Sequence, residues 1–211
     1  MVFCAHPNYN GCMIKKTRFI LVLFAFLFAG QAHAFFSPLS VSILPPVQFP
    51  PEDFSITGVR ASLLWGNHRD VYGLDVGVLG NVTQLEFVGI GVSGLVNITH
   101  GTTTVIGLQA AGGANINTNK TAVYGLQLAL GLNQMTAESS VVGLEAALVN
   151  LVDHTKVYGF QVGVYNKSLA VYGFQIGLVN VTDSLHGIQI GLINFNRTGL
   201  FVVSPILNVG F

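Results

Sequence analysis

Apolar residues alternate with small or polar residues along most of the chain after residue 57. In residues 171–180, VYGFQIGLVN, one face of an extended segment holds Phe174, Ile176 and Leu178, and the other holds Gln175 between two glycines. A period of two is typical of a β-strand, because successive side chains of a strand point to opposite sides. The pattern therefore predicts an all-β fold.

The unit repeats at short intervals. Aligned on their glycine, the units begin at Gly58, Gly73, Gly89, Gly107, Gly125, Gly143, Gly159, Gly173 and Gly187, with a degenerate unit from Phe201. The steps between starts are 15, 16, 18, 18, 18, 16, 14, 14 and 14 residues. An asparagine follows each start, at Asn67, Asn81, Asn97, Asn115, Asn133, Asn150, Asn166, Asn180, Asn194 and Asn208. Such self-similarity indicates one structural unit stacked or paired against the next.

The two faces of the units differ in the same way throughout. One face is Leu, Val, Ile and Phe, and the other is small or polar. The central position of the polar face reads Arg60, Asp75, Gly91, Gln109, Gln127, Glu145, Gln161, Gln175 and Gln189. Gly and Gln suit a crowded interior better than a solvated surface. Small and polar residues inside, with apolar residues outside, are the pattern of a transmembrane barrel.

We therefore predict an up-and-down antiparallel transmembrane β-barrel of about ten short strands over residues 58–211. A 14-residue step leaves ten residues for a tilted membrane-spanning strand and four for a turn. The residues predicted to face the lumen are Arg60, Asp75, Gln109, Gln127, Glu145, Gln161, Gln175 and Gln189. A structural hydrogen-bond network is favoured for them over a pore lining, since a barrel of this size is normally filled by its own side chains.

The alternative fold is a β-solenoid, in which units stack in parallel and identical residues form ladders. The asparagines and the tyrosines at strand starts suit such ladders, although the drift from 14 to 18 residues would distort a stack. A solenoid is expected to bury the Leu/Val face and to leave the Gln face in water. One observation disagrees with the barrel: Val203 and Pro205 fall at polar-face positions, so the terminal segment exchanges its faces.

The N-terminus has the organisation of a secretory signal peptide over residues 1–34. Lys15, Lys16 and Arg18 precede the apolar run Phe19–Ala29, and Ala32-His33-Ala34 is a small-x-small cleavage signature. Translation is expected to start at Met13. Residues 35–57, with five prolines, are predicted to be an extended linker that packs on the domain end or serves as a tether.

Composition limits the partners. Only 9% of residues are charged while 51% are hydrophobic, and the formal net charge is zero. Nucleic acid is not expected, because its binding requires clustered Lys and Arg. We expect the lipid bilayer of a Gram-negative outer membrane as the environment. The outer-membrane assembly machinery is expected to recognise the strand that ends at Phe211.

No catalytic or metal-binding constellation is present in the sequence, and no cofactor is predicted. The histidines His68, His100, His154 and His186 lack metal-site spacing and are expected to be exposed in loops. Residues 67–70, NHRD, are expected to form a solvated hairpin tip, with ligand binding at a barrel mouth as the alternative. An enzyme using Asp70, Asp153, Asp183, His68 and His154 is the weakest hypothesis.

The units GFQVGVYN, GFQIGLVN and GIQIGLIN, with the ending FVVSPILNVGF, resemble bacterial surface-repeat proteins built on G-x-Q-x-G-L-x-N. The match is strong over Gly159–Phe211 and looser over Gly58–Asn150, where Ala often replaces the second Gly. The resemblance implies a cell-surface or outer-membrane location without an assigned activity. The predicted function is an integral outer-membrane barrel of structural, surface-exposed or narrow-pore type. The alternative is a secreted β-solenoid that serves as a surface binding or adhesion module.

Overall fold

The computed structural model describes residues 35–211, so the predicted signal peptide lies outside the described residues. All regular structure in residues 35–211 is β, and the strands form one continuous 15-stranded sheet. The strands are β1 (Phe36–Leu44), β2 (Val47–Phe49), β3 (Ser55–Ser62), β4 (Trp65–Gly77), β5 (Gly80–Ser93), β6 (Val96–Thr99), β7 (Thr102–Ala111), β8 (Ala114–Asn117), β9 (Thr121–Ala129), β10 (Leu132–Met135), β11 (Ser139–Ala146), β12 (Val149–Val162), β13 (Tyr165–Ile176), β14 (Val179–Asn196) and β15 (Val203–Gly210).

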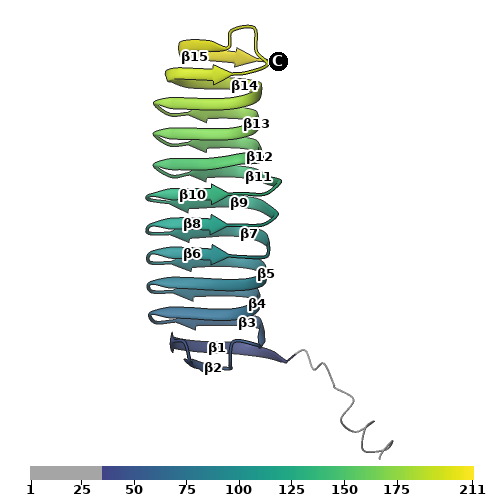
Figure 1. Cartoon of the computed structure of the whole chain (residues 1–211), viewed down its shortest axis with the longest axis vertical. Helices are drawn as coiled ribbons and strands as arrows, with labels where there is room; N and C mark the ends of the chain where they lie inside the picture. Colours follow the sequence, from purple (N-terminus) through teal and green to yellow (C-terminus); the bar gives the residue numbers. More distant parts are fainter. Residues whose placement is uncertain (1–34) are drawn as a thin grey trace, which may run out of the picture. The chain divides into compact units, whose positions relative to one another are not determined.

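The sheet winds into a β-solenoid of about ten turns (Figure 1). From β3 to β14 every neighbouring pair of strands is parallel and in register with the repeat. Gly159, for example, lies opposite Gly143 on one side and opposite Gly173 on the other. The predicted all-β class is confirmed, whereas the predicted antiparallel barrel is wrong and the alternative solenoid is right.

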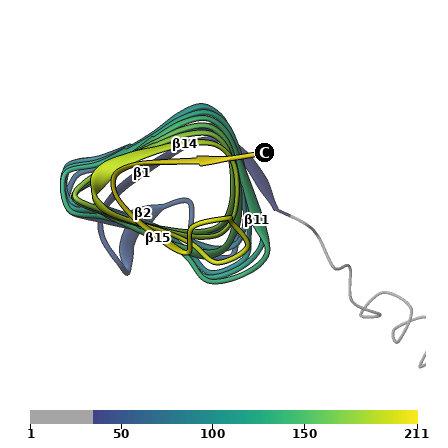
Figure 2. The same ribbon diagram turned by 90° about the horizontal axis from the view of Figure 1, so that it is seen from above.

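Each repeat forms a complete coil because it contains two strand runs rather than one. The run through the Gln position builds one wall, and the run through the Asn position builds the opposite wall, as the view along the axis shows (Figure 2). Parallel strands need a crossover connection, and here the second wall serves as that crossover. A barrel would have needed a hairpin after every run.

Extra residues in the longer repeats leave the coil at one edge only. Between β8 and β9, and between β10 and β11, three residues bulge out, whereas β13 and β14 run continuously around the same edge. The walls therefore stay in register while the step length varies from 14 to 18 residues. This explains why the drift in repeat length does not disturb the stack.

From Gly73 to Gly187, the glycine that opens each repeat is required by its conformation. Gly173 has φ of +138°, in a region that non-glycine residues rarely adopt. A Cβ atom at this position would collide with the backbone carbonyl oxygen of Gly159 in the preceding coil. The glycine thus permits the close approach of successive coils at this position.

Both ends of the sheet are closed by short antiparallel segments. At the N-terminal end, β1 pairs in parallel with β3 and antiparallel with β2. The predicted linker 35–57 is therefore part of the sheet and contributes its first two strands. At the C-terminal end, the chain reverses after Asn196 and β15 runs antiparallel to β14. This reversal explains why Val203 and Pro205 do not fit the repeat alignment.

The described residues contain no helix long and apolar enough to cross a membrane.

Candidate binding surface and the polar interior

Asparagines form a continuous ladder along the inside of one wall. The ladder runs from Asn97 to Asn194. In each step the side-chain amide nitrogen of one asparagine donates to the amide oxygen of the asparagine in the next coil, with distances of 2.8–3.0 Å. The same nitrogen of Asn166 also donates to the carbonyl oxygen of Ile176 at 2.9 Å. Because both amide protons and the amide oxygen are used, these buried side chains cost little in desolvation.

A second ladder follows the inside of the opposite wall. Gln189 Nε2 donates to Gln175 Oε1 at 2.7 Å, and Gln175 Nε2 donates to Gln161 Oε1 at 2.7 Å. Donors in this ladder point towards the N-terminal end, whereas donors in the asparagine ladder point towards the C-terminal end. The two rows of amide dipoles therefore oppose each other across the coil.

An ion pair takes the place of the glutamines in the first coils. Arg60 Nε donates to Asp75 Oδ1 at 2.7 Å and Arg60 Nη2 donates to Asp75 Oδ2 at 2.5 Å. The guanidinium also donates to Val82 O at 2.7 Å and to Thr83 Oγ1 at 3.2 Å. The pair is buried and bidentate, which is the geometry that best offsets the loss of hydration.

Glu145 interrupts the glutamine ladder with a carboxyl group. It accepts a hydrogen bond from Gln161 Nε2 at 3.1 Å, but Glu145 Oε1 and Gln127 Oε1 are both buried without a partner. Gln127 lies directly opposite Glu145 in the register. Burial raises the pKa of Glu145 to about 8, against the smaller opposing effect of the Gln161 hydrogen bond. A proton on Oε1 would let the carboxyl donate to Gln127 and complete the ladder.

All eight residues predicted to face the lumen point into the coil and are 0–3% exposed. The structure brings them into one column, broken at Gly91, and their own side chains fill the space between the walls. A small cavity of about 10 Å³ lies beside Gly91, where the column lacks a side chain. Its volume matches a single water molecule.

The other candidate residues do not converge. His68 is fully buried, with Nε2 at 3.0 Å from Ser40 Oγ, so the expectation that it is exposed is wrong. Burial and then the charge of Arg60 lower its pKa to about 4. Residues 67–70 lie within β4 and not at a hairpin tip. Asp153 and Asp183 form surface ion pairs with Lys167 and Arg197 in different coils.

An apolar edge runs along the outside of the solenoid. It consists of the two-residue turns between the walls, together with the corresponding bend inside β14, and is named here the leucine edge. Its large side chains, 37–74% exposed, are Leu63, Leu64, Val78, Leu79, Leu95, Leu130, Leu148, Val164, Leu178, Leu192 and Ile193. Among the described coils only the one with Gly112–Gly113 at the turn lacks such a residue. The sequence pattern did not reveal this edge, because the alternation of apolar residues continues through these positions as it would in a strand.

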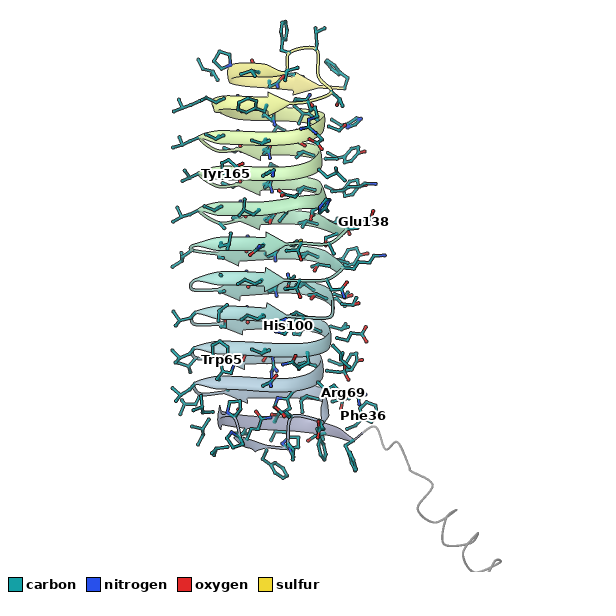
Figure 3. All side chains as sticks on the ribbon, in the orientation of Figure 1. Phe36, Trp65, Arg69, His100, Glu138 and Tyr165 are labelled. Carbon is teal, nitrogen blue, oxygen red and sulfur yellow. The ribbon has the colours of Figure 1, made fainter. Side chains whose placement is uncertain are left out.

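Exposed charged residues gather at the opposite edge, named here the polar edge. In the stick view Arg69 and Glu138 lie on one side of the coil, and Trp65 and Tyr165 lie towards the other (Figure 3). The charged residues at the polar edge are Arg69, Glu86, Lys120, Glu138, Asp153, Lys156, Asp183 and Arg197. Four positive and four negative side chains are interspersed there, so the edge is polar without a strong net charge.

Backbone groups at the leucine edge bond to each other from coil to coil. Val164 N donates to Leu148 O at 2.8 Å, and Leu178 N donates to Val164 O at 3.0 Å. The same pattern joins Leu95 to Leu79 at 2.9 Å. The turns therefore satisfy these groups without water, which removes the usual obstacle to placing a turn in an apolar environment.

Aromatic side chains stack on the outside of the Gln wall near the C-terminal end. The rings of Tyr158 and Tyr172 are 4.8 Å apart with planes 9° apart, and Tyr172 stacks on His186 at 4.6 Å. Phe160 and Phe174 form a parallel pair at 5.2 Å. The ring faces cover each other along the axis, so the stack presents ring edges outward.

No family model, no curated protein and no solved structure matches the chain. The resemblance to surface-repeat proteins stays a prediction that rests on the repeat units themselves.

Proposed function

We propose that the chain is an exported β-solenoid that serves as a surface binding module of the cell envelope. The signal-peptide pattern at residues 1–34 supports export, and the resemblance of the repeats supports a location at the outer membrane or cell surface. The observation that carries the proposal is the exposed apolar exterior. Patches of more than a few hundred Å² are rare on soluble monomers and mark interaction surfaces.

The fold suits such a role because rigidity and binding are separated. Buried amide ladders hold the coils in register, so the outward-facing side chains of both walls are not needed for this and can contact a partner. The predicted role of the C-terminal strand in barrel assembly does not apply to a solenoid. Attachment to the envelope is instead assigned to the apolar exterior.

Fractionation of a Gram-negative host that expresses the full chain tests this proposal. We expect processed protein that begins at Phe35, recovered with the outer membrane or on the cell surface. Unprocessed protein in the cytoplasm would contradict it. Surface labelling of intact cells separates exposure outside the cell from retention in the periplasm.

A further inference from the structure

The leucine edge and the outer columns of both walls form a graded surface rather than a uniform one. In the coil through Tyr158, the outward residues from the polar edge to the leucine edge are Lys156, Tyr158, Phe160, Val162 and Val164. The order is charged, amphipathic, aromatic, aliphatic. Another coil reads Tyr172, Phe174, Ile176 and Leu178 in the same direction.

Several coils of the Asn wall have the same gradient in reverse chain order. After the leucine edge, one coil presents Val149, Leu151 and then Asp153, and another presents Val179, Val181 and then Asp183. The middle column of the Asn wall also holds Asn67, Gln134 and Lys167, so its gradient is less complete than that of the Gln wall. The Lys167 ammonium reaches Asp153 at 3.0 Å, towards the polar edge. Polarity therefore falls steadily towards the leucine edge on the Gln wall and in part of the coils on the Asn wall. A partner that matches this surface must be apolar in depth and polar at its boundary.

We propose that the leucine edge inserts lengthwise into one leaflet of a phospholipid membrane. From Phe160 to Val164 the apolar part of the Gln wall is about 13 Å deep at 3.3 Å per residue. Half of the hydrocarbon core of a bilayer measures about 15 Å. The stacked side chains of Tyr158 and Tyr172 then lie at headgroup depth, where tyrosine is enriched. The charged polar edge stays in water.

Insertion requires that no backbone group lose a hydrogen bond to water. Hydrogen bonds along the solenoid axis join each coil to the next in both walls, and the turns of the leucine edge do the same. The inserted strip would be about 40 Å long, from eight steps of about 4.8 Å between Leu64 and Leu192. This inference rests on the proposed function, since it names the partner of that exterior.

Other partners fit the surface less well. A second copy of this chain would cover one flat wall. It would not account for a polarity gradient that involves both walls and the leucine edge. Sugars stack on aromatic faces, which are covered by neighbouring rings here. An added β-strand would need a free sheet edge. However, β2 spans only three residues between Pro46 and Pro50, and β15 contains Pro205.

Flotation of the purified protein with phosphatidylcholine vesicles tests the inference. The altered variant is Leu130→Glu with Leu148→Glu on the leucine edge. The matched control is Thr102→Glu with His154→Glu, which adds two carboxylates at exposed positions of the polar edge. We expect the wild type to float with uncharged vesicles at low and high salt. The edge variant should bind at least about tenfold more weakly, and the control within about twofold of the wild type.

Trp65, the one tryptophan of the chain, follows directly after the leucine edge and reports on insertion. Its emission should shift to the blue on vesicle addition and should be quenched by brominated lipid. Circular dichroism of both variants verifies the fold. Failure to float, or equal loss of binding in both variants, would overturn the inference.

Two further results separate this inference from the proposed function. If the Leu130→Glu, Leu148→Glu variant stays on the cell envelope, its partner there is not lipid. The membrane inference would then fail, whereas the proposed function as a surface module would stand. A dimer in light scattering that the edge variant dissociates would assign the leucine edge to a second copy. Loss of export would instead remove the proposed function itself.

Discussion

The interior and the exterior of this solenoid exchange the roles they have in most globular domains. Asn and Gln fill the inside in hydrogen-bonded ladders, while Leu, Val and Phe occupy the outside and stay largely exposed. A cluster of buried apolar residues that includes Val105, Val123 and Val141 runs along one inner corner. Polarity alone therefore does not tell which face of a strand is buried.

The difference follows from what each region must do. Identical amides in register satisfy one another at every step, which polar side chains in an irregular core rarely achieve. The exterior makes no comparable demand, because the coils are already joined. Changes inside should therefore be costly for stability, and changes outside should affect binding.

The strongest test of this difference removes one member of the buried ion pair. Asp75→Ala leaves the Arg60 guanidinium buried without its counter-charge, which should lower the free energy of unfolding by about 3–5 kcal/mol. Urea denaturation followed by circular dichroism measures this loss. Asp153→Ala, which breaks the exposed pair with Lys167, should cost less than about 1 kcal/mol. Equal losses would contradict the comparison.

Breaking the asparagine ladder should have the next largest effect. Asn166→Leu leaves Asn150 Nδ2, Asn180 Oδ1 and Ile176 O without this partner. Ile176 O keeps its hydrogen bond from Gly163 N at 3.0 Å, so two groups are orphaned. At about 1–3 kcal/mol for each, the variant should lose at least about 2 kcal/mol of stability. Tyr165→Leu, which changes the outward neighbour, serves as the control and should be nearly neutral. Thermal unfolding of both proteins decides the matter.

Glu145 should make stability depend on pH in a direction unusual for a carboxyl group. Its pKa rises from 4.5 to about 8 in the fold, so the folded state holds a proton that the unfolded state releases. The stabilisation is complete below about pH 4.5 and is lost as the pH rises towards 8, by at most about 1.4 kcal/mol per pH unit. Urea midpoints measured across this range show the slope.

Glu145→Gln isolates this contribution from the other carboxyl groups. A glutamine at this position can donate to Gln127 and accept from Gln161 without a bound proton. The variant should therefore lose the Glu145 part of the pH slope, and it should be the more stable protein at neutral pH. Identical slopes for the variant and the wild type would show that Glu145 does not hold the proton.

A change on the leucine edge should have the smallest effect on stability. Leu130 is 74% exposed, so Leu130→Ser should change the free energy of unfolding by less than about 0.5 kcal/mol. The same variant should bind phosphatidylcholine vesicles severalfold more weakly. A large loss of stability would show that the exterior contributes to the fold after all.

Much of the architecture could be predicted from the periodicity. The repeat starts, the β class and the inward direction of the Gln column all follow from a period of two. The barrel prediction failed because a barrel and this solenoid share that period and the same distribution of polarity. They differ in the direction of neighbouring strands, which depends on whether the repeat holds one strand run or two.

One signal in the sequence could have distinguished the two folds. Asn and Gln recur at a nearly constant separation, as in Gln161 and Asn166 or Gln175 and Asn180. Identical side chains can bond to one another at every step only if neighbouring strands are parallel and in register. The expectation that a solenoid buries its apolar face concealed this signal. The burial of His68 could not be foreseen, because it depends on Ser40 and on the backbone of Pro50.

The closed ends give the solenoid a defined length that can change only in whole coils. Duplication or deletion of one 14- to 18-residue unit between the β1–β2 segment and β15 would keep the cross-section and both ladders. Each such event would alter the length by about 4.8 Å. The length of such a solenoid can therefore change by whole coils, while the cross-section and the side-chain contacts of each remaining coil stay the same.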